Sequence, residues 1–168
     1  ELAGGWTDGG GAGAGRLPSE EGSDLIQEHG NYFPALEESA ELLWREARLN
    51  SDDLYGGLVR HLRDTLTVDF RIARLEEEPG ALRRFDTDRR VLTLSELLPP
   101  RSRNFQLAVQ IALLTLSSTI DGILRRSSLS TKDSKNLARV ALANYFAGAV
   151  LMPYKPFLAA ARDARYDV

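Results

Sequence analysis

The chain has 168 residues, of which 43% are apolar, and its formal net charge is −3. This length supports one domain with a sizeable core and leaves room for a flexible arm, while the negative charge argues against a broad nucleic-acid-binding face. Cysteine is absent, which excludes disulfides and thiolate catalysis within this sequence.

The ends and the hydropathy of the chain set further limits. The sequence begins with Glu1 rather than Met, so we expect a piece of a longer protein. No apolar run approaches the roughly 20 residues that a membrane-spanning helix needs, and no basic-then-apolar leader opens the chain. We therefore expect a cytoplasmic protein that makes no contact with a membrane.

The first segment, residues 1–18, predicts a flexible linker. Half of the chain's 14 glycines lie between Glu1 and Gly15, and glycine at that density costs too much backbone entropy to fold by itself. We expect residues 19–168 to form one folded domain.

Two helices are predicted next. Pro34 can open a helix that extends to about Leu49, with acidic residues in its first turns, where the helix dipole favours them. Asn50 or Ser51 is expected to cap a second helix. The apolar positions of that second helix are Leu54, Leu58 and Leu62. His61 lies beside them; with no second imidazole one helical turn away, we interpret it as a structural residue.

A short sheet follows. Apolar and polar residues alternate over Thr67–Ile72, which predicts a half-buried strand. Two more strands are predicted at Leu82–Phe85 and Val91–Ser95, joined by a turn at Asp86–Asp88. We expect these three strands to form a small antiparallel sheet.

The rest of the chain is predicted to be helical, in segments from Arg103 to about Arg126, from Asp133 to about Met152 and from Pro156 to about Ala164. The first of these carries an apolar face made by Phe105, Ala108, Val109, Ala112, Leu113 and Leu116. The fold class is therefore α+β: a mostly helical domain with a small antiparallel sheet.

Two stretches on these helices resemble the signatures of the ImmA/IrrE-type metallopeptidases. Ser102–Leu116 reads SRNFQLAVQIALLTL, which is similar to the active-site helix of that family, where R-x-F-x-L-A directly precedes the zinc motif H-E-x-x-H. Leu142–Pro153 reads LANYFAGAVLMP and resembles the second signature, whose leading glutamate is the third zinc ligand. The resemblance implies a zincin-like metallopeptidase scaffold.

The positions that carry the chemistry differ from that family. Laid on the motifs, the two zinc-binding histidines fall on Val109 and Leu113, the catalytic glutamate on Gln110, and the third zinc ligand on Val140. None of these side chains can bind zinc or act as a general base. We therefore expect no metal, no cofactor and no enzymatic activity; a peptidase with an unorthodox metal site is the alternative.

A wider resemblance covers about residues 31–168. The motifs ANYFA-x-A-x-x-MPY and ARxxRYDV resemble motifs in the central domain of the short-chain fatty acyl-CoA-responsive transcription regulators. This bacterial group includes propionate and glyoxylate-bypass regulators. In that family a helix-turn-helix domain precedes this region and a cysteine-containing domain follows it, so DNA would be contacted only through a domain outside this sequence. The resemblance implies an acyl-CoA sensor domain. A ligand-free dimerisation module, with the chain as a homodimer, is the alternative.

Arginine is concentrated around the predicted sheet. The arginines are Arg71, Arg74, Arg83, Arg84, Arg89, Arg90, Arg101 and Arg103. Such a group can bind phosphates through charge-assisted bidentate hydrogen bonds; the alternative is a solvated face opposite the acidic residues 76–78. For the phosphates of coenzyme A we expect Arg84, Arg89, Arg90 and Arg103 to be the partners.

The acyl group needs an apolar site. If the scaffold brings its former ligand positions together, Val109, Leu113 and Val140 line a hollow in which each buried methylene contributes about 0.8 kcal/mol; the alternative is that they close the core. Asn144 and Tyr145 are expected beside the thioester or pantetheine. Tyr154 and Lys155 are expected at the mouth of the pocket. Ordinary half-buried packing is the alternative for both tyrosines.

Overall fold

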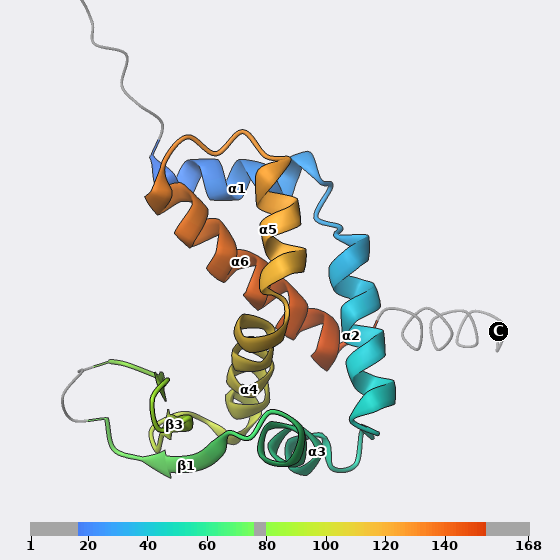
Figure 1. Cartoon of the computed structure of the whole chain (residues 1–168), viewed down its shortest axis with the longest axis vertical. Helices are drawn as coiled ribbons and strands as arrows, with labels where there is room; N and C mark the ends of the chain where they lie inside the picture. The colour runs from blue at the N-terminus through green and yellow to red at the C-terminus, as the bar shows by residue number, and fades with distance from the viewer. Residues whose placement is uncertain (1–16, 76–79, 154–168) are drawn as a thin grey trace, which may run out of the picture.

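A computed structural model describes residues 17–75 and 80–153 of the chain (Figure 1). The helices are α1 (Pro18–Glu28), α2 (Pro34–Glu46), α3 (Leu54–Arg60), α4 (Pro100–Thr115), α5 (Ser117–Arg125) and α6 (Lys132–Leu151), with a π-helical segment η1 (His61–Thr65) that continues α3. The strands are β1 (Asp69–Ala73), β2 (Arg83–Asp86) and β3 (Val91–Ser95). The mostly helical α+β class is confirmed. The expected helix at residues 156–164 and nearly all of the expected linker lie outside the described residues.

The sheet is mixed, so the prediction of an antiparallel sheet was wrong. Its strand order is β1-β3-β2. β2 and β3 pair antiparallel across the predicted turn, but β1 runs parallel to β3, with Asp69 opposite Val91 and Ala73 opposite Ser95. The alternation of apolar residues identified the strands correctly and carries no information about which strand is the neighbour, because every pairing buries the same face.

Helix α4 lies at the centre of the fold. Every residue from Leu107 to Ala112 is buried, so the prediction of a single apolar face was too narrow. Neighbours surround the helix: α6 and α3 pack against it, and Figure 1 shows it standing beside the sheet. A helix covered on all sides is buried whatever its periodicity.

The predicted helix from Arg103 to Arg126 is two helices. The chain bends by 76° between α4 and α5. Just before the bend, the Thr115 hydroxyl donates a hydrogen bond of 2.7 Å to the Ile111 carbonyl, and Ser117, Ser118 and Thr119 follow. Such residues compete for backbone hydrogen bonds and favour helix ends over helix interiors, which accounts for the break.

The cap of α3 also differs from the prediction. The Asp53 carboxylate accepts a hydrogen bond of 2.9 Å from the backbone N–H of Gly56 and so caps the helix. The Asn50 side chain instead accepts from the backbone N–H groups of Asp52 and Asp53. A side chain that forms a turn just before the helix looks like a cap in the sequence, because both roles use the same residue types.

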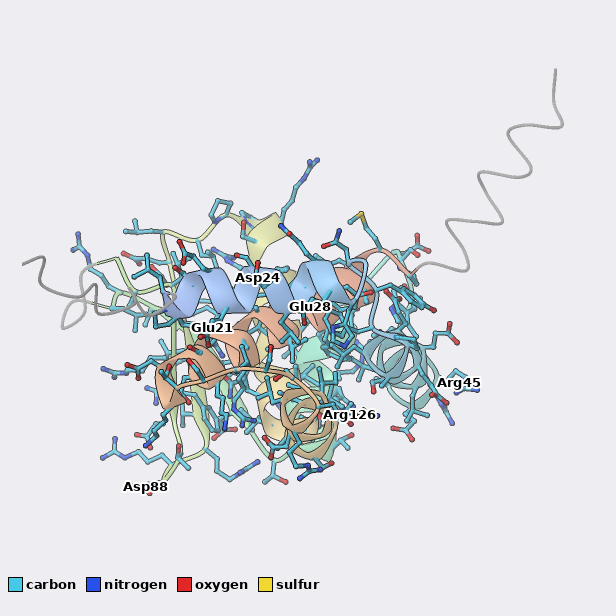
Figure 2. All side chains as sticks on the ribbon, turned by 90° about the horizontal axis from the view of Figure 1, so that it is seen from above. Glu21, Asp24, Glu28, Arg45, Asp88 and Arg126 are labelled. Atoms are coloured by element: carbon cyan, nitrogen blue, oxygen red, sulfur yellow. The ribbon has the colours of Figure 1, made fainter. Side chains whose placement is uncertain are left out.

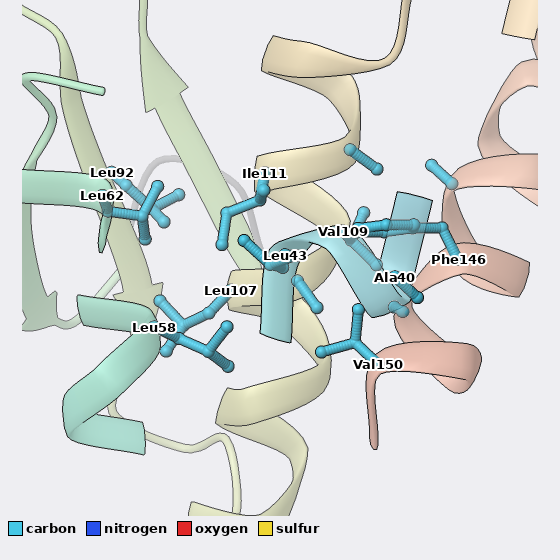
Figure 3. Close-up of a cluster of buried hydrophobic side chains, with 14 of the residues drawn as sticks. Ala40, Leu43, Leu58, Leu62, Leu92, Leu107, Val109, Ile111, Phe146 and Val150 are labelled. Carbon is cyan, nitrogen blue, oxygen red and sulfur yellow. The ribbon is translucent and has the colours of Figure 1, made fainter. Parts of the chain in front are cut away.

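Two apolar clusters make up the core, and α6 contributes to both. The larger one joins α2, α3, α4, α6 and the sheet, and Figure 3 shows part of it. The smaller one joins α1, α5 and α6 with the start of α2. Because Leu142 belongs to the smaller cluster and Phe146 to the larger one, one helix holds the two halves of the domain together.

Two polar contacts fix the outer helices against α6 and its preceding loop. The Trp44 indole N–H on α2 donates to the Val150 carbonyl at 2.9 Å. On α1, the Glu21 carboxylate (Figure 2) accepts hydrogen bonds from the Ser130 hydroxyl at 2.6 Å and from the Ser130 backbone N–H at 3.0 Å. Both contacts join residues more than 100 positions apart in the sequence, so they tie α1 and α2 to the C-terminal part of the described chain.

Candidate ligand-binding site

The N-terminus of α4 presents positive charge to solvent. Its first turn holds no acidic residue, and Arg101 is exposed while Arg103 is half-buried. The Nε atom of Arg103 is buried and has no hydrogen-bond partner. The positive end of the helix dipole attracts anions. Pro100 has no N–H, and the N–H groups of Ser102 and Arg103 already donate to the Pro99 carbonyl, so the guanidinium groups of Arg101 and Arg103 are the main donors at this end. This end of α4 is suited to an anionic group.

Behind it, α4 carries the residue that replaces the peptidase glutamate. Gln110 is 3% exposed, and its side-chain carbonyl accepts a hydrogen bond from the guanidinium of Arg83 on β2. Burial lowers the pKa of Arg83 from its usual value, and the Nε atom of this side chain is also buried without a partner. A polar contact between α4 and the sheet edge thus occupies the position at which that motif places its catalytic base.

The other predicted phosphate partners divide into two groups. Arg84 and Arg89 are exposed, as a phosphate contact requires. Arg90 serves the fold instead: its guanidinium donates to the carbonyls of Leu66 and Thr67, at 2.6 and 3.2 Å. Thr67 has a φ of 54°, which is a strained conformation for a β-branched residue. Arg90 therefore holds a strained turn in front of β1.

The three former zinc-ligand positions do not form the expected hollow. Val109 is 2% exposed and belongs to the larger core cluster, and Leu113 packs against that cluster. Val140 is 49% exposed on α6, so it cannot line a buried cavity with the other two. For Val109 the alternative reading, closure of the core, is the one that the structure supports.

Of the remaining predicted residues, Asn144 is exposed and Tyr145 joins two helices. The Tyr145 hydroxyl accepts a hydrogen bond from the Phe33 backbone N–H at 3.3 Å and donates one to the Glu37 carboxylate at 2.6 Å. Burial and the bond to Glu37 raise the pKa of Tyr145 to about 12. The hydroxyl is thus committed to fastening α6 to α2. Tyr154 and Lys155 lie outside the described residues.

A pocket that the sequence did not reveal lies among α2, η1, α4 and α6. Its volume is about 290 Å³, and it is lined by Ser39, Leu42, Leu43, Glu46, His61, Thr65, Leu66, Ile111, Thr115, Leu116 and Phe146. His61, interpreted above as structural, is 9% exposed. Burial lowers the pKa of His61, and the charge of Glu46 acts in the opposite direction to a smaller extent. The only signal in the sequence was the position of His61 next to an apolar helix face.

Residues 63–168 match the IrrE N-terminal-like domain family, also described as Peptidase_M78. The chain belongs to this family. In this chain, α4 carries most of the first signature stretch, Ser102–Leu116, and α6 carries most of the second, Leu142–Pro153. Within residues 17–75 and 80–153, no group of three His, Cys, Asp or Glu side chains is placed to hold a metal ion.

Relatives of this IrrE N-terminal-like domain include proteins named as regulators. It is 34% identical over 163 residues to the HTH-type transcriptional regulator RamB of Mycobacterium tuberculosis, covering 97% of this chain and 34% of the relative. It is 34% identical to the HTH-type transcriptional regulator PrpR of the same organism, covering 90% of this chain and 31% of PrpR. It is 31% identical to the propionyl-CoA carboxylase regulator of Cereibacter sphaeroides, covering 90% of this chain and 31% of that protein.

A solved structure shares the fold. A Mycobacterium tuberculosis transcriptional regulator superposes with a TM-score of 0.83 at 34% identity, over 91% of this chain and 46% of that one. The chain spans about a third of the length of RamB, PrpR and the Cereibacter sphaeroides regulator.

No single helix in the described part is both long and apolar enough to cross a membrane. Helices α4 and α5 would qualify only as a bent pair, and the middle of α4 is buried in the core.

Proposed function

We propose that this domain is the ligand-binding part of a bacterial transcription regulator and that it senses short-chain acyl-coenzyme A in the cytoplasm, with DNA contacted by another part of the regulator. The names of RamB and PrpR support the regulatory role, and the name of the Cereibacter sphaeroides relative connects that protein with a short-chain acyl-CoA. The domain is proposed to have no peptidase activity, because valine, glutamine and leucine stand at the positions of the zinc motif.

The observation that carries the ligand proposal is the arginine end of α4. Coenzyme A presents phosphates, and the positive dipole end of α4 together with the half-buried guanidinium of Arg103, whose Nε has no hydrogen-bond partner, provides a site for them. Exposed Arg84, Arg89 and Arg101 supply further charge. Arg90 is left out of this set because its guanidinium already holds two backbone carbonyls.

Titration calorimetry with acetyl-, propionyl- and butyryl-CoA tests this proposal. A ligand that binds only the folded chain stabilises it by about 2.7 kcal/mol at a hundredfold excess over Kd, so a thermal shift is the parallel measurement. Dephospho-coenzyme A is expected to bind less tightly than coenzyme A if the 3′-phosphate meets an arginine. Absence of heat and of a thermal shift at millimolar ligand would favour the ligand-free dimerisation module.

Variants locate the binding site. Arg103→Gln is expected to weaken all three acyl-CoAs about tenfold or more, because a hydrogen bond to a charged group contributes about 1.5–3 kcal/mol. Arg125 is an exposed arginine on α5, so Arg125→Gln is the matched control and should bind like the parent chain.

Tyr145→Phe tests whether Tyr145 contacts the ligand or serves the fold. Loss of stability with unchanged affinity indicates a structural role.

A further inference from the structure

The pocket between α2, η1, α4 and α6 contains a buried histidine that the proposed function does not use. The described residues make no hydrogen bond to the His61 ring, although its side chain is 9% exposed and lines the pocket. The ring nitrogens are not among the fully buried, unpartnered polar atoms of the described residues, so the ring can be reached from the pocket and can exchange a hydrogen bond with a ligand there. The pocket volume of about 290 Å³ is close to the lower end of the roughly 300–1,000 Å³ of small-molecule sites.

The body of the pocket is apolar. It is lined by the aliphatic and aromatic side chains of Leu42, Leu43, Leu66, Ile111, Leu116 and Phe146. An apolar ligand fragment that leaves water for such a surface gains about 25 cal/mol for each Å² buried. The lining therefore favours a short aliphatic body.

The polar groups around it are mainly hydrogen-bond acceptors. The Ser39 hydroxyl donates its hydrogen to the Ala35 carbonyl at 2.7 Å, and the Thr115 hydroxyl donates to Ile111 in the same way, so both oxygens remain available only as acceptors. Glu46 adds an exposed carboxylate. Among the residues that line the pocket, Glu46 and His61 are the only titratable ones. These polar groups, Ser39, Thr115 and Glu46, form the rim of the pocket. A positively charged hydrogen-bond donor complements the rim, and the Glu46 carboxylate repels an anion.

From this arrangement we propose that the pocket binds a small aliphatic amine, with its carbon chain among the leucines and Phe146 and its ammonium group between Glu46 and the ring of His61. The neutral imidazole has one nitrogen that accepts a hydrogen bond, and burial keeps His61 neutral by lowering its pKa. The π-helical η1, which carries His61 and Thr65, and the strained Thr67 just after it fit a ligand site, where such irregular backbone is frequent.

This site is separate from the proposed acyl-CoA site. Its α4 residues, Ile111 and Thr115, lie at least eight positions after Arg103, or about 12 Å along the helix axis. The two proposals can therefore be tested independently. A chain that does not bind acyl-CoA could still bind the amine, and a chain that does not bind the amine could still bind acyl-CoA.

Three probes with one alkyl chain test the chemistry. Isopentylamine, isopentanol and 4-methylpentanoate carry the same isopentyl chain and differ in the head group, and each is titrated by ligand-observed NMR at constant ionic strength and pH 7.5. The expected order of affinity is amine, then alcohol, then carboxylate. Equal binding of all three, tighter binding of the carboxylate, or no saturable binding of the amine up to tens of millimolar would overturn the proposal.

Two variants place the binding in this pocket. Leu42 is 43% exposed on α2, so Leu42→Trp fills the pocket with little risk to the core and should abolish amine binding. Leu137→Trp, at a residue that is 48% exposed on α6 and outside the pocket, is the matched control and should bind normally. Binding that survives Leu42→Trp contradicts the assignment.

The charge of the rim is tested by Glu46→Gln. This variant should lose up to about fivefold in affinity for isopentylamine, the range expected for an exposed ion pair, and should bind isopentanol as before. An unchanged preference for the amine over the alcohol would show that Glu46 does not recognise the head group, which overturns the proposed mode of binding.

Discussion

At the scale of single residues, Arg83 shows how a charged side chain can be held inside a small domain. Desolvation lowers the pKa of Arg83, yet an arginine remains charged under all ordinary conditions. The side-chain carbonyl of Gln110 accepts one of its hydrogen bonds without adding a second buried charge. A leucine at position 110 would leave that guanidinium donor unsatisfied, which is far more costly than losing an exposed hydrogen bond.

His61 provides a prediction about pH. Because burial lowers the folded-state pKa of His61 below its usual value of 6.5, the unfolded chain binds this proton more readily. The stability that comes from burying the neutral ring is present above about pH 6.5 and is lost as pH falls toward the folded-state pKa. We expect His61→Gln to reduce the loss of unfolding free energy between pH 7.5 and 5.5, measured by urea denaturation at both values. Parallel pH profiles for the variant and the parent chain would count against it.

At the scale of elements, the start of α6 is stabilised by its N-cap residue, Thr131. The Thr131 hydroxyl accepts a hydrogen bond of 3.0 Å from the Ser134 backbone N–H and shares another with the buried Ser134 hydroxyl. Thr131→Ala removes both contacts and is expected to cost about 1–2 kcal/mol of unfolding free energy, as measured by urea denaturation. Thr131→Ser keeps the oxygen and should stay close to the parent; equal losses in both variants would show that the methyl group matters instead.

Sequence patterns predicted most helices and strands correctly. They did not predict features that depend on which segments are neighbours in space. Val91–Ser95 was predicted with its observed bounds, and Pro34 begins α2 as expected, because alternation and a proline start are local signals. The parallel pairing of β1 with β3 and the burial of Gln110 depend on which segments meet in space. The pattern within one segment does not report that.

The candidate sites show the same division. Arg103 was named from the local density of arginine, and the structure places it at a helix start with an unpartnered donor. Val140 was named from its place in a motif, and its exposure excludes a buried hollow there. The pocket beside His61 was missed because three other segments supply most of its walls, and a single sequence does not show that these segments meet.

At the scale of the whole molecule, α6 contributes to both apolar clusters, so we expect the domain to unfold in a single transition. Phe146→Ala in the larger cluster should cost about 3–5 kcal/mol and Leu142→Ala in the smaller one about 2–5 kcal/mol, and both should shift one common midpoint. The check compares far-UV circular dichroism with Trp44 fluorescence in a Trp6→Phe background, where Trp44 is the only tryptophan. Coincident curves support one cooperative unit.

Leu137→Ala is the control for this pair, since it removes a side chain of the same helix that is half exposed. Its midpoint should lie near that of the parent chain. If Leu142→Ala instead lowered the circular dichroism transition and left the Trp44 transition in place, the two clusters would be independent folding units.

The central place of β3 in the sheet has a consequence for assembly. The hairpin of β2 and β3 closes over a short turn, whereas β1 reaches β3 only by passing the whole of β2 in the sequence. Closing a longer loop costs more entropy before any contact compensates for it, so β1 is expected to dock late in folding and to detach early. While β1 is away, one edge of β3 is open to a strand from another molecule. Exchange of β1 between two copies is therefore the misassembly to which this sheet is most exposed.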